Sequence, residues 1–369
     1  MSSDLFTCTS LKTLFKWVFE YDKNGHILGI SKDLFFLPQG DDPFTLQRYG
    51  QILETPIGLA AGPHTQLSQN IICAWLTGAR YMELKTVQVL DELEVTKPCI
   101  DMSDEGYNCE WSQELKLDQS FDEYLNGWIM LHVLRDKFQL TGDESGFIFN
   151  ISVGYNLEGI MSPTVQRFLD KMADCTELLD QKTEEVAAFY PRIKELKIPA
   201  KITSNVTIST MHGCPPEETE KICRYFIEDR KLDTTIKLNP TLLGPEKLRE
   251  ILNDKLGFET VVPDLAFEHD LAYDAGVVMI KALSESAEKS GVAFNLKLTN
   301  TLETTNVRQN LPKNEEMVYM SGRSLHPISI NLAAKLQQEF DGKLEISFSA
   351  GADSNNISDI LKTVKIITN

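Results

Sequence analysis

Residues 205–218, NVTISTMHGCPPEE, concentrate side chains that could take part in catalysis. An asparagine, several hydroxyls, His212 and Cys214 precede two prolines and two acidic residues. This proline and acid pattern is typical of a first helical turn, and it places Cys214 at or near the N-cap. A thiol at a helix N-terminus has a lowered pKa and can transfer a proton. The sequence also permits a second interpretation, in which Cys214 only caps the helix.

Two other chemistries fit this segment poorly. Zinc requires three or four ligands at workable spacing, and no second ligand pair follows His212 and Cys214. A Cys–His hydrolase needs a third residue that orients the histidine and an oxyanion hole, and neither is identifiable. We therefore expect no metal site.

Short apolar runs alternate with amphipathic segments along the chain. The expected strands are residues 56–62, 80–87, 146–154, 200–209, 234–240, 292–300, 344–351 and 364–368. The expected helices are residues 162–179, 215–229, 245–255, 275–290 and 327–340. Continuous apolar strands separated by helices indicate a parallel sheet with covered faces. Eight such strands predict an α/β fold of the (β/α)8 TIM-barrel type.

We expect two parts in the chain. Residues 1–50 predict an N-terminal helix and hairpin extension, and residues 51–369 predict the barrel. The chain ends at Asn369, where the eighth strand should pass into its helix, so the barrel is expected to lack its last helix.

Polar residues collect where the expected strands end, and barrel active sites lie at that end. These residues are Gly62, His64, Lys85, Thr86, Asn150, Asn205, Lys237, Asn239, Thr299, Asn300 and Gly351. Lys85 and Lys237 stand within apolar strand ends, and a buried lysine requires a partner. We therefore expect a ligand site at this rim.

Composition narrows the class of protein. The formal net charge of −18 disfavours nucleic acid and anionic membranes as partners. No run of about 18 apolar residues predicts a membrane span. The seven cysteines never form a CxxC pair, which fits a cytoplasmic protein with reduced thiols and excludes a self-contained iron–sulfur site.

Several motifs carry a family resemblance. ETPIGLAAGPHTQ, ELKTVQV, IKLNP, KLTNT, YMSGRSLHPISINLAAKL and SFSAGAD, in this order, resemble the flavin barrel of the dihydroorotate dehydrogenases (DHODH) and, more closely, that of dihydropyrimidine dehydrogenase. The runs ELKTVQ, KPCID, STMHGCPPEE, KLNPTLLG and YMSGRSL look most like the flavin-barrel segment of the selenate reductase subunit family, a larger flavin and iron–sulfur oxidoreductase. The resemblance covers about residues 45–369.

This resemblance implies an FMN site. The matching cofactor-binding residues are Ala60, Ala61, Gly62, Lys85, Thr86, Asn150, Lys237, Thr299, Ser321, Gly322, Gly351 and Thr368. Lys85 matches the lysine beside flavin N5, and Lys237 matches the lysine at the N1/O2 edge. Reduced flavin carries negative charge at that edge, which a fixed ammonium group stabilises.

The resemblance also implies a substrate site. Its residues are Asn108, Glu110, Asn205, Asn300 and Thr301. A carboxamide can pair with the adjacent N–H and C=O groups of a cyclic amide or ureide. The expected substrate is therefore a planar nitrogen heterocycle, similar to a pyrimidine or a purine.

Cys214 is the expected proton-transfer residue, with Lys237 at the flavin edge and His212 as a lesser candidate. Related barrels carry a cysteine or serine on this loop. In dihydropyrimidine dehydrogenase it stands three residues after the strand asparagine, whereas Cys214 stands nine residues after it. By spacing alone, the residue that corresponds to that cysteine is Ile208, whose side chain cannot transfer a proton. Ser209 and Thr210 are the alternative candidates for proton transfer.

One departure favours a rival interpretation. The phosphate loop usually reads Gly-Gly, but this chain has Ala350-Gly351, and the methyl group of Ala350 could crowd a phosphate. A degenerate barrel that acts as a structural or docking subunit would fit this change.

In the enzyme interpretation, the absence of a GxGxxG motif indicates that electrons come from a flavin and iron–sulfur module. That module, with FAD and the clusters, would lie on the same longer chain or on a partner.

Overall fold

The computed structural model describes residues 6–39, 41–87, 98–102, 106–109, 114–140, 144–209, 214–308 and 310–364. The chain divides into two compact units. Unit 1 comprises Met1–Glu92, Gln113–Ser152 and Gly159–Asn205, and unit 2 comprises Leu93–Ser112, Val153–Glu158 and Val206–Asn369. Within the described ranges, no helix is both long enough and apolar enough to cross a bilayer.

The N-terminal part of unit 1 contains the expected helix and hairpins. Its elements are α1 (Leu11–Asp22), β1 (His26–Ile27), β2 (Ile30–Ser31), β3 (Leu46–Arg48) and β4 (Gln51–Leu53). Helix α1 buries Leu11, Leu14, Phe15 and Val18, the i, i+3, i+4 and i+7 positions of one helical face. Strands β3 and β4 pair as a second antiparallel hairpin, and the boundary expected at residue 50 falls in its turn.

Unit 1 then forms a three-stranded parallel sheet. Its strands are β5 (Gly58–Leu59), β6 (Tyr81–Glu83) and β9 (Ile148–Val153), with β6 paired to both neighbours. All six residues of β9 are buried, as expected of a strand covered on both faces. The helices that accompany this sheet are α2 (Ser68–Leu76), α3 (Leu117–Lys137), α5 (Pro163–Ala173) and α6 (Thr176–Val186).

The helices of unit 1 differ from the sequence prediction. Helices α2 and α3 were not expected. The Trp128 ring of α3 packs edge-on against Phe147 and Phe149, in and beside β9. The single helix expected over residues 162–179 is wrong, because it is divided between α5 and α6. The backbone N–H of Cys175 donates to the Ala200 carbonyl instead of to a helical carbonyl, so the first helix ends there.

Unit 2 contains a second three-stranded parallel sheet with helices between its strands. The strands are β11 (Asp233–Leu238), β12 (Phe294–Leu298) and β15 (Ile346–Phe348). The helices are α7 (Pro216–Arg224), α8 (Pro245–Arg249), α9 (Asp264–Glu268), α10 (Tyr273–Ser290), α11 (His326–Glu339) and α12 (Ile357–Val364). Helices α7 and α8 continue as π-helical turns over Tyr225–Asp229 and Glu250–Lys255. Two short elements lie where the chain passes between the units, α4 (Leu157–Ile160) and β10 (Asn205–Ile208).

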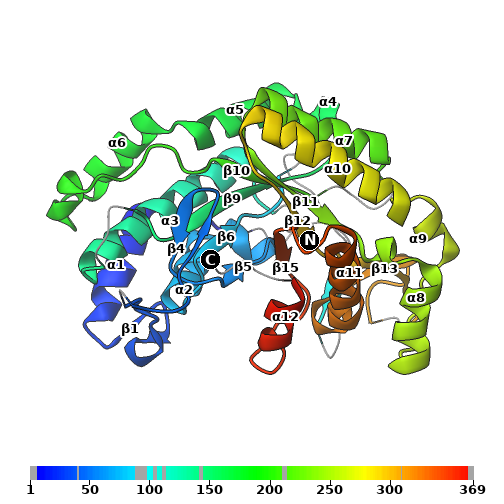
Figure 1. The fold of residues 1–369 in the computed structure, drawn as a ribbon. Coiled ribbons are helices and arrows are strands. Elements are labelled where there is room, and N and C mark those ends of the chain that lie inside the picture. The colour runs from blue at the N-terminus through cyan, green and yellow to red at the C-terminus, as the bar shows by residue number, and fades with distance from the viewer. Residues whose placement is uncertain are drawn as a thin grey trace. The chain divides into compact units, whose positions relative to one another are not determined.

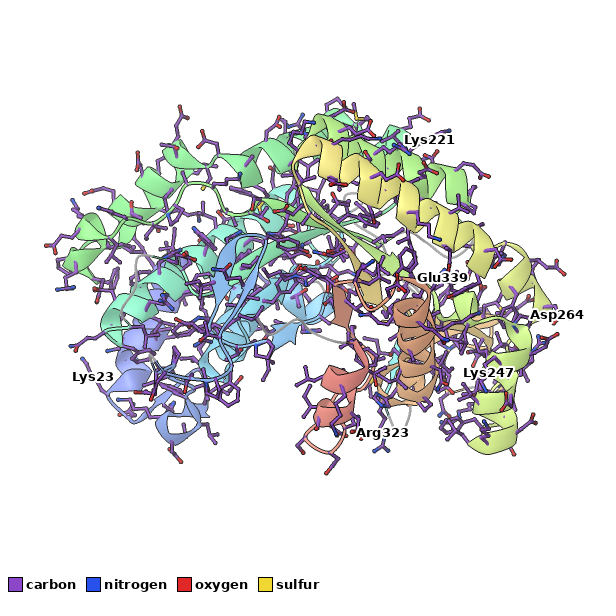
Figure 2. The ribbon with its side chains drawn as sticks, viewed as in Figure 1. Lys23, Lys221, Lys247, Asp264, Arg323 and Glu339 are labelled. Atoms are coloured by element: carbon purple, nitrogen blue, oxygen red, sulfur yellow. The ribbon has the colours of Figure 1, made fainter. Side chains whose placement is uncertain are left out.

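The helices of unit 2 turn their charged side chains outward. Helix α10 runs beside α7, and α11 lies beside α12 (Figure 1). Lys221, Lys247, Asp264 and Glu339 project away from the ribbon in Figure 2. Polar outer faces of this kind are what amphipathic helices on a sheet require.

Unit 2 also contains an antiparallel sheet that the sequence did not predict. Its strands, in spatial order, are β13 (Leu302–Thr305), β14 (Met317–Ser321), β8 (Gly106–Asn108) and β7 (Ile100–Asp101). The pairing of β8 with β14 joins segments more than 200 residues apart, with Gly106 opposite Ser321.

The expected strand over residues 364–368 is wrong at its start. Val364 is the last residue of α12, where its buried side chain continues the apolar face of that helix. Residues 365–368 lie outside the described part of the chain.

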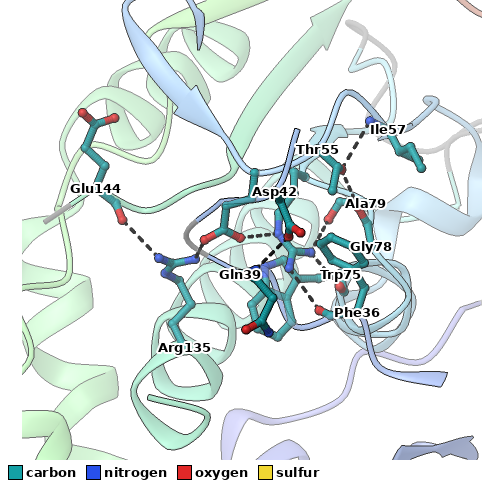
Figure 3. Close-up of polar contacts among 12 residues, drawn as sticks. Phe36, Gln39, Asp42, Thr55, Ile57, Trp75, Gly78, Ala79, Arg135 and Glu144 are labelled. Carbon is teal, nitrogen blue, oxygen red and sulfur yellow. Dashed lines mark hydrogen bonds and ion pairs between the residues drawn. The ribbon is translucent and has the colours of Figure 1, made fainter. Parts of the chain in front are cut away.

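A buried ion-pair cluster fixes the start of β6. Arg80 is fully buried, and its Nε donates to Glu54 Oε2 at 2.6 Å, while Arg135 of α3 pairs with the other oxygen of the same carboxylate. Arg80 Nη1 also donates to the carbonyls of Trp75 (2.8 Å) and Ala79 (3.0 Å). Figure 3 shows these contacts, including Arg135 reaching the cluster from its helix. Burial lowers the pKa of Arg80, and the Glu54 carboxylate opposes that shift.

Replacing Glu54 with Gln should destabilise unit 1 strongly. The change keeps the shape of the side chain but leaves two guanidinium groups without their shared anion, which costs about 3–5 kcal/mol for a broken buried pair. Urea unfolding measures the loss. Glu250→Gln is the control, because Glu250 pairs with Lys247 and Lys255 on the exposed surface. Equal stability of the two variants would contradict the anchoring role of the cluster.

Candidate functional site

Lys85 is a buried amine on the segment that follows β6. Backbone bonds from Leu84 to Asn150 and from Val87 to Ser152, both 2.9 Å, continue the alignment of this segment beside β9. The lysine is 8% exposed, and no described residue hydrogen-bonds to its Nζ. Burial lowers the pKa of Lys85 to about 8, and the Glu114 carboxylate opposes this shift. Lys85 can therefore gain or lose a proton near neutral pH.

The loop after β5 contains three of the expected cofactor-binding residues. Ala60 is exposed, and Ala61 and Gly62 are half-buried. The N–H of Ala61 lies 3.4 Å from Glu83 Oε2, and a Cβ atom at Gly62 would lie 2.7 Å from the ring of His64. The pKa of His64 is lowered by desolvation and, secondarily, by the charge of Lys85.

Two expected ligand asparagines bind each other. Asn150 Nδ2 donates to Asn205 Oδ1 at 2.6 Å, and both side chains are fully buried. Their expected placement at strand carboxyl ends is wrong. Asn150 is the third residue of the six-residue strand β9, and Asn205 is the first residue of β10. Next to this pair, the hydroxyls of Thr86 and Ser152 are 2.8 Å apart.

Unit 2 brings Cys214 and Lys237 into one pocket. The pocket is small, with a volume of about 30 Å³, and it opens to solvent. Its lining also includes Thr219, Asn239 and Asp270. Lys237 is the penultimate residue of β11, so its expected position at a strand carboxyl end is confirmed.

Cys214 lies next to the N-cap of α7, which agrees with its expected place at or near the helix start. Pro215 is the N-cap of α7, and Cys214 precedes it. The hydroxyl of Thr219, in the second turn of α7, donates to the Cys214 sulfur at 3.5 Å. A hydroxyl donor and a nearby helix N-terminus both favour the thiolate over the thiol.

Two loops of unit 2 meet at Gly351. This glycine has φ +62°, and a Cβ atom there would lie 2.2 Å from the Cα of Arg323. Only glycine allows the loop after β15 to approach the Ser321–Gly322 turn so closely. Ala350 is not among the residues with positive φ, so its methyl group causes no backbone strain. The side chain of Arg323 extends into solvent beside these loops (Figure 2).

The residues after β12 lie next to β11. The Asn300 N–H donates to the Leu238 carbonyl at 2.8 Å, and its side chain is buried. Thr299 pairs with the hydroxyl of Ser329 on α11 at 2.8 Å. Thr301 is half-buried, immediately before β13.

The remaining expected site residues are divided between the antiparallel sheet and the parts of the chain that are not described. Asn108 ends β8 opposite Tyr319 of β14, two positions along the register from the Gly106–Ser321 pair. Glu110, His212 and Thr368 lie outside the described residues.

Sequence reasoning missed three polar residues near Cys214 and Lys237. Thr219 contacts the Cys214 sulfur, and Asp270 accepts a 2.6 Å hydrogen bond from Thr241 at the pocket wall. Lys297 is 97% buried within the apolar strand β12. A charged residue inside FNLKL was the available signal, because lysine is almost never buried without a role or a partner.

The family model described as "Oxidoreductase YgfK, N-terminal TIM-barrel domain" matches residues 28–368. The chain belongs to this family. The match confirms the predicted TIM-barrel fold. "Putative oxidoreductase YgfK" of Escherichia coli K12 is 46% identical, covering 93% of this chain and 35% of the relative, and the protein of strain O157:H7 gives the same values. The chain thus spans about a third of the length of these relatives.

A solved structure shares the fold. DHODH from Eimeria tenella in complex with ferulenol aligns with a TM-score of 0.51 and 14% identity, covering 97% of this chain and 84% of that one. The ligand-free form gives a TM-score of 0.47 and 16% identity, with coverage of 88% and 80%.

The contact at Gly351 predicts a specific loss of stability. Gly351→Ala should cost more than the roughly 1–3 kcal/mol of a strained backbone, because the added methyl also meets the Arg323 backbone. The control is Gly291→Ala, where φ is +71° and no atom lies within 4 Å of the added Cβ. Urea unfolding of both variants measures the difference. Equal losses of unfolding free energy in the two variants would show that the close approach of the two loops adds no steric cost at Gly351.

Proposed function

We propose that this chain is the FMN-binding barrel of an oxidoreductase that exchanges a hydride between flavin N5 and a planar nitrogen heterocycle. The observation that carries the proposal is the placement of Cys214 and Lys237 in one pocket at the carboxyl end of β11. A proton-transfer group and a cation at such a rim are what reduction of a C=C bond in a ring requires.

The chain's own residues fit FMN. Gly351 and Gly322 stand in two loops that touch, and the resemblance assigns both loops to the FMN phosphate. Backbone N–H groups of such glycine loops would bind the phosphate. FMN would supply the hydride chemistry when bound. Lys237 would stabilise negative charge on the reduced ring.

Cys214 would hold the proton that accompanies the hydride. Its thiol accepts a hydrogen bond from Thr219, which stabilises the thiolate after the proton has left. Asn108 and Asn300 would pair with the amide edge of the substrate, as the resemblance to dihydropyrimidine dehydrogenase implies. The mutual hydrogen bond of Asn150 and Asn205 gives these two residues a positioning role in the proposal.

The electron source would lie elsewhere. The relatives are nearly three times as long as the segment they share with this chain. We propose that a flavin and iron–sulfur module, in the same polypeptide or on a partner, carries FAD and clusters and exchanges electrons with the barrel.

Bound flavin is the first prediction of this function. The purified protein, reconstituted with excess FMN and desalted, should retain flavin absorbance at about one FMN per chain. Lys237→Ala should weaken retention or shift the reduction potential, because it removes the proposed cation. Lys247→Ala, on the outer surface in Figure 2, is the matched control. A colourless protein after reconstitution would instead support the degenerate, structural barrel.

Cys214→Ala should keep FMN but slow substrate reduction by about a hundredfold or more, the usual scale of general acid catalysis. Stopped-flow reoxidation of chemically reduced flavin by candidate pyrimidines and purines measures the rate. Cys73→Ala is the control, because Cys73 lies on α2 of unit 1. An unchanged rate in Cys214→Ala would return this residue to a structural role before α7.

A further inference from the structure

Two lysines occupy the same level of the parallel sheet in unit 2. Lys237 of β11 is in register with Lys297 of β12, and Lys297 is in register with Ser347 of β15. Register partners of parallel strands point to the same face, with backbones about 4.8 Å apart. The three side chains therefore form one row, which we call the Lys237–Lys297–Ser347 row.

The opposite face of β12 is apolar. Leu296 and Leu298, on either side of Lys297 in sequence, are fully buried, and α10 and α11 contact this strand. Since side chains alternate along a strand, Lys297 points away from the leucines. It points to the same side as Lys237, and Lys237 lines the pocket with Cys214.

Lys297 is more deeply buried than Lys237. It is 3% exposed, whereas Lys237 is half-buried at the pocket. Like charges directly beside each other on one face of a sheet are destabilising. An anion that contacts both ammonium groups attracts each of them and so offsets their mutual repulsion. This attraction is strong where little water is present, because the local dielectric constant is low.

The row also extends toward the second loop of the unit. Ser347 adds a hydroxyl at its far end, and Gly351 follows four residues later. One line of donors thus runs from the pocket toward the Gly351 loop. Such donors match a planar anion with charge delocalised over neighbouring nitrogen and oxygen atoms.

We propose that the Lys237–Lys297–Ser347 row is an anion-binding site for the deprotonated N–C=O edge of a planar ring. Lys297 supplies the second cation of this site. The ring is either the reduced flavin of the proposed function or an anionic heterocyclic substrate, and the two share the same chemistry. The flavin case rests on the proposed function, whereas the substrate case does not require flavin.

The first measurement compares FMN-loaded wild type, Lys297→Gln and Lys297→Arg by spectroelectrochemistry. If the row binds the flavin, Lys297→Gln lowers the preference for reduced over oxidised FMN about tenfold or more, and each tenfold step shifts a two-electron potential by about 30 mV. Lys297→Arg retains most of the preference because it retains the charge. Lys289→Gln, an exposed lysine at the end of α10, is the matched control and leaves the potential unchanged.

The second measurement uses FMN-free protein and calorimetry with two probes. 5-Nitrouracil loses a ring N–H proton at neutral pH and so carries the anionic N–C=O edge, whereas uracil is its neutral counterpart. If the row binds the substrate, wild type prefers 5-nitrouracil by tenfold or more, and Lys297→Gln removes that preference without changing the flavin potential. The wild-type preference tests the site even where the variant does not fold.

The possible failures are distinguishable. Wild type that retains no FMN overturns the proposed function, and the preference for 5-nitrouracil over uracil still decides the row. Retained FMN with an unchanged potential in Lys297→Gln, together with equal 5-nitrouracil and uracil binding by wild type, overturns the row. Lys297→Gln could also lower the melting temperature while the flavin potential and the binding preference for the anionic probe stay unchanged. That result shows that Lys297 is structural, and it likewise overturns the row.

Discussion

The shared carboxylate of Glu54 is the contact on which the rest of unit 1 depends. It pairs with Arg80 directly before β6 and with Arg135 on α3, so it joins the second hairpin, a strand and the longest helix of the unit. The backbone N–H of Arg80 donates to the Ile57 carbonyl, and its carbonyl accepts from the N–H of Ile148. One end of β6 is fixed in this way. The segment beyond its other end carries Lys85, whose burial depends on that alignment.

Unit 2 uses a different means of holding its polar groups. Its parallel strands set Lys237 beside Lys297, and a glycine allows two loops to touch where any side chain would collide with the backbone. Charge and close approach are thus placed by strand register and by the lack of a Cβ atom. Register fixes the backbones that carry the two lysines, and burial of Lys297 limits the motion of its flexible stem.

The sequence predicted the alternating architecture because buried parallel strands are continuous apolar runs. Helix α3 escaped prediction because it is buried on several sides and includes the buried polar residues Glu123 and Asn126, so it shows no single apolar stripe. The antiparallel sheet escaped because its central pair joins β8 and β14, which no local pattern can reveal. The positions of the candidate residues were predicted best at strand ends, as for Lys237. They were predicted poorly where a residue's partner lies far along the chain, as for Asn150 and Asn205.

The division of the chain has a consequence for how the protein is made. The backbone passes between the two units five times before the last long segment, residues 206–369, completes unit 2. During synthesis, unit 1 can complete its contacts only after residue 205 has left the ribosome. By then the two earlier segments of unit 2, Leu93–Ser112 and Val153–Glu158, are present, but the parallel sheet of unit 2 has not yet been synthesised. Neither unit corresponds to a continuous stretch of the gene. A cut within residues 93–205 would divide both units, so recombination should exchange this stretch together with its flanking segments.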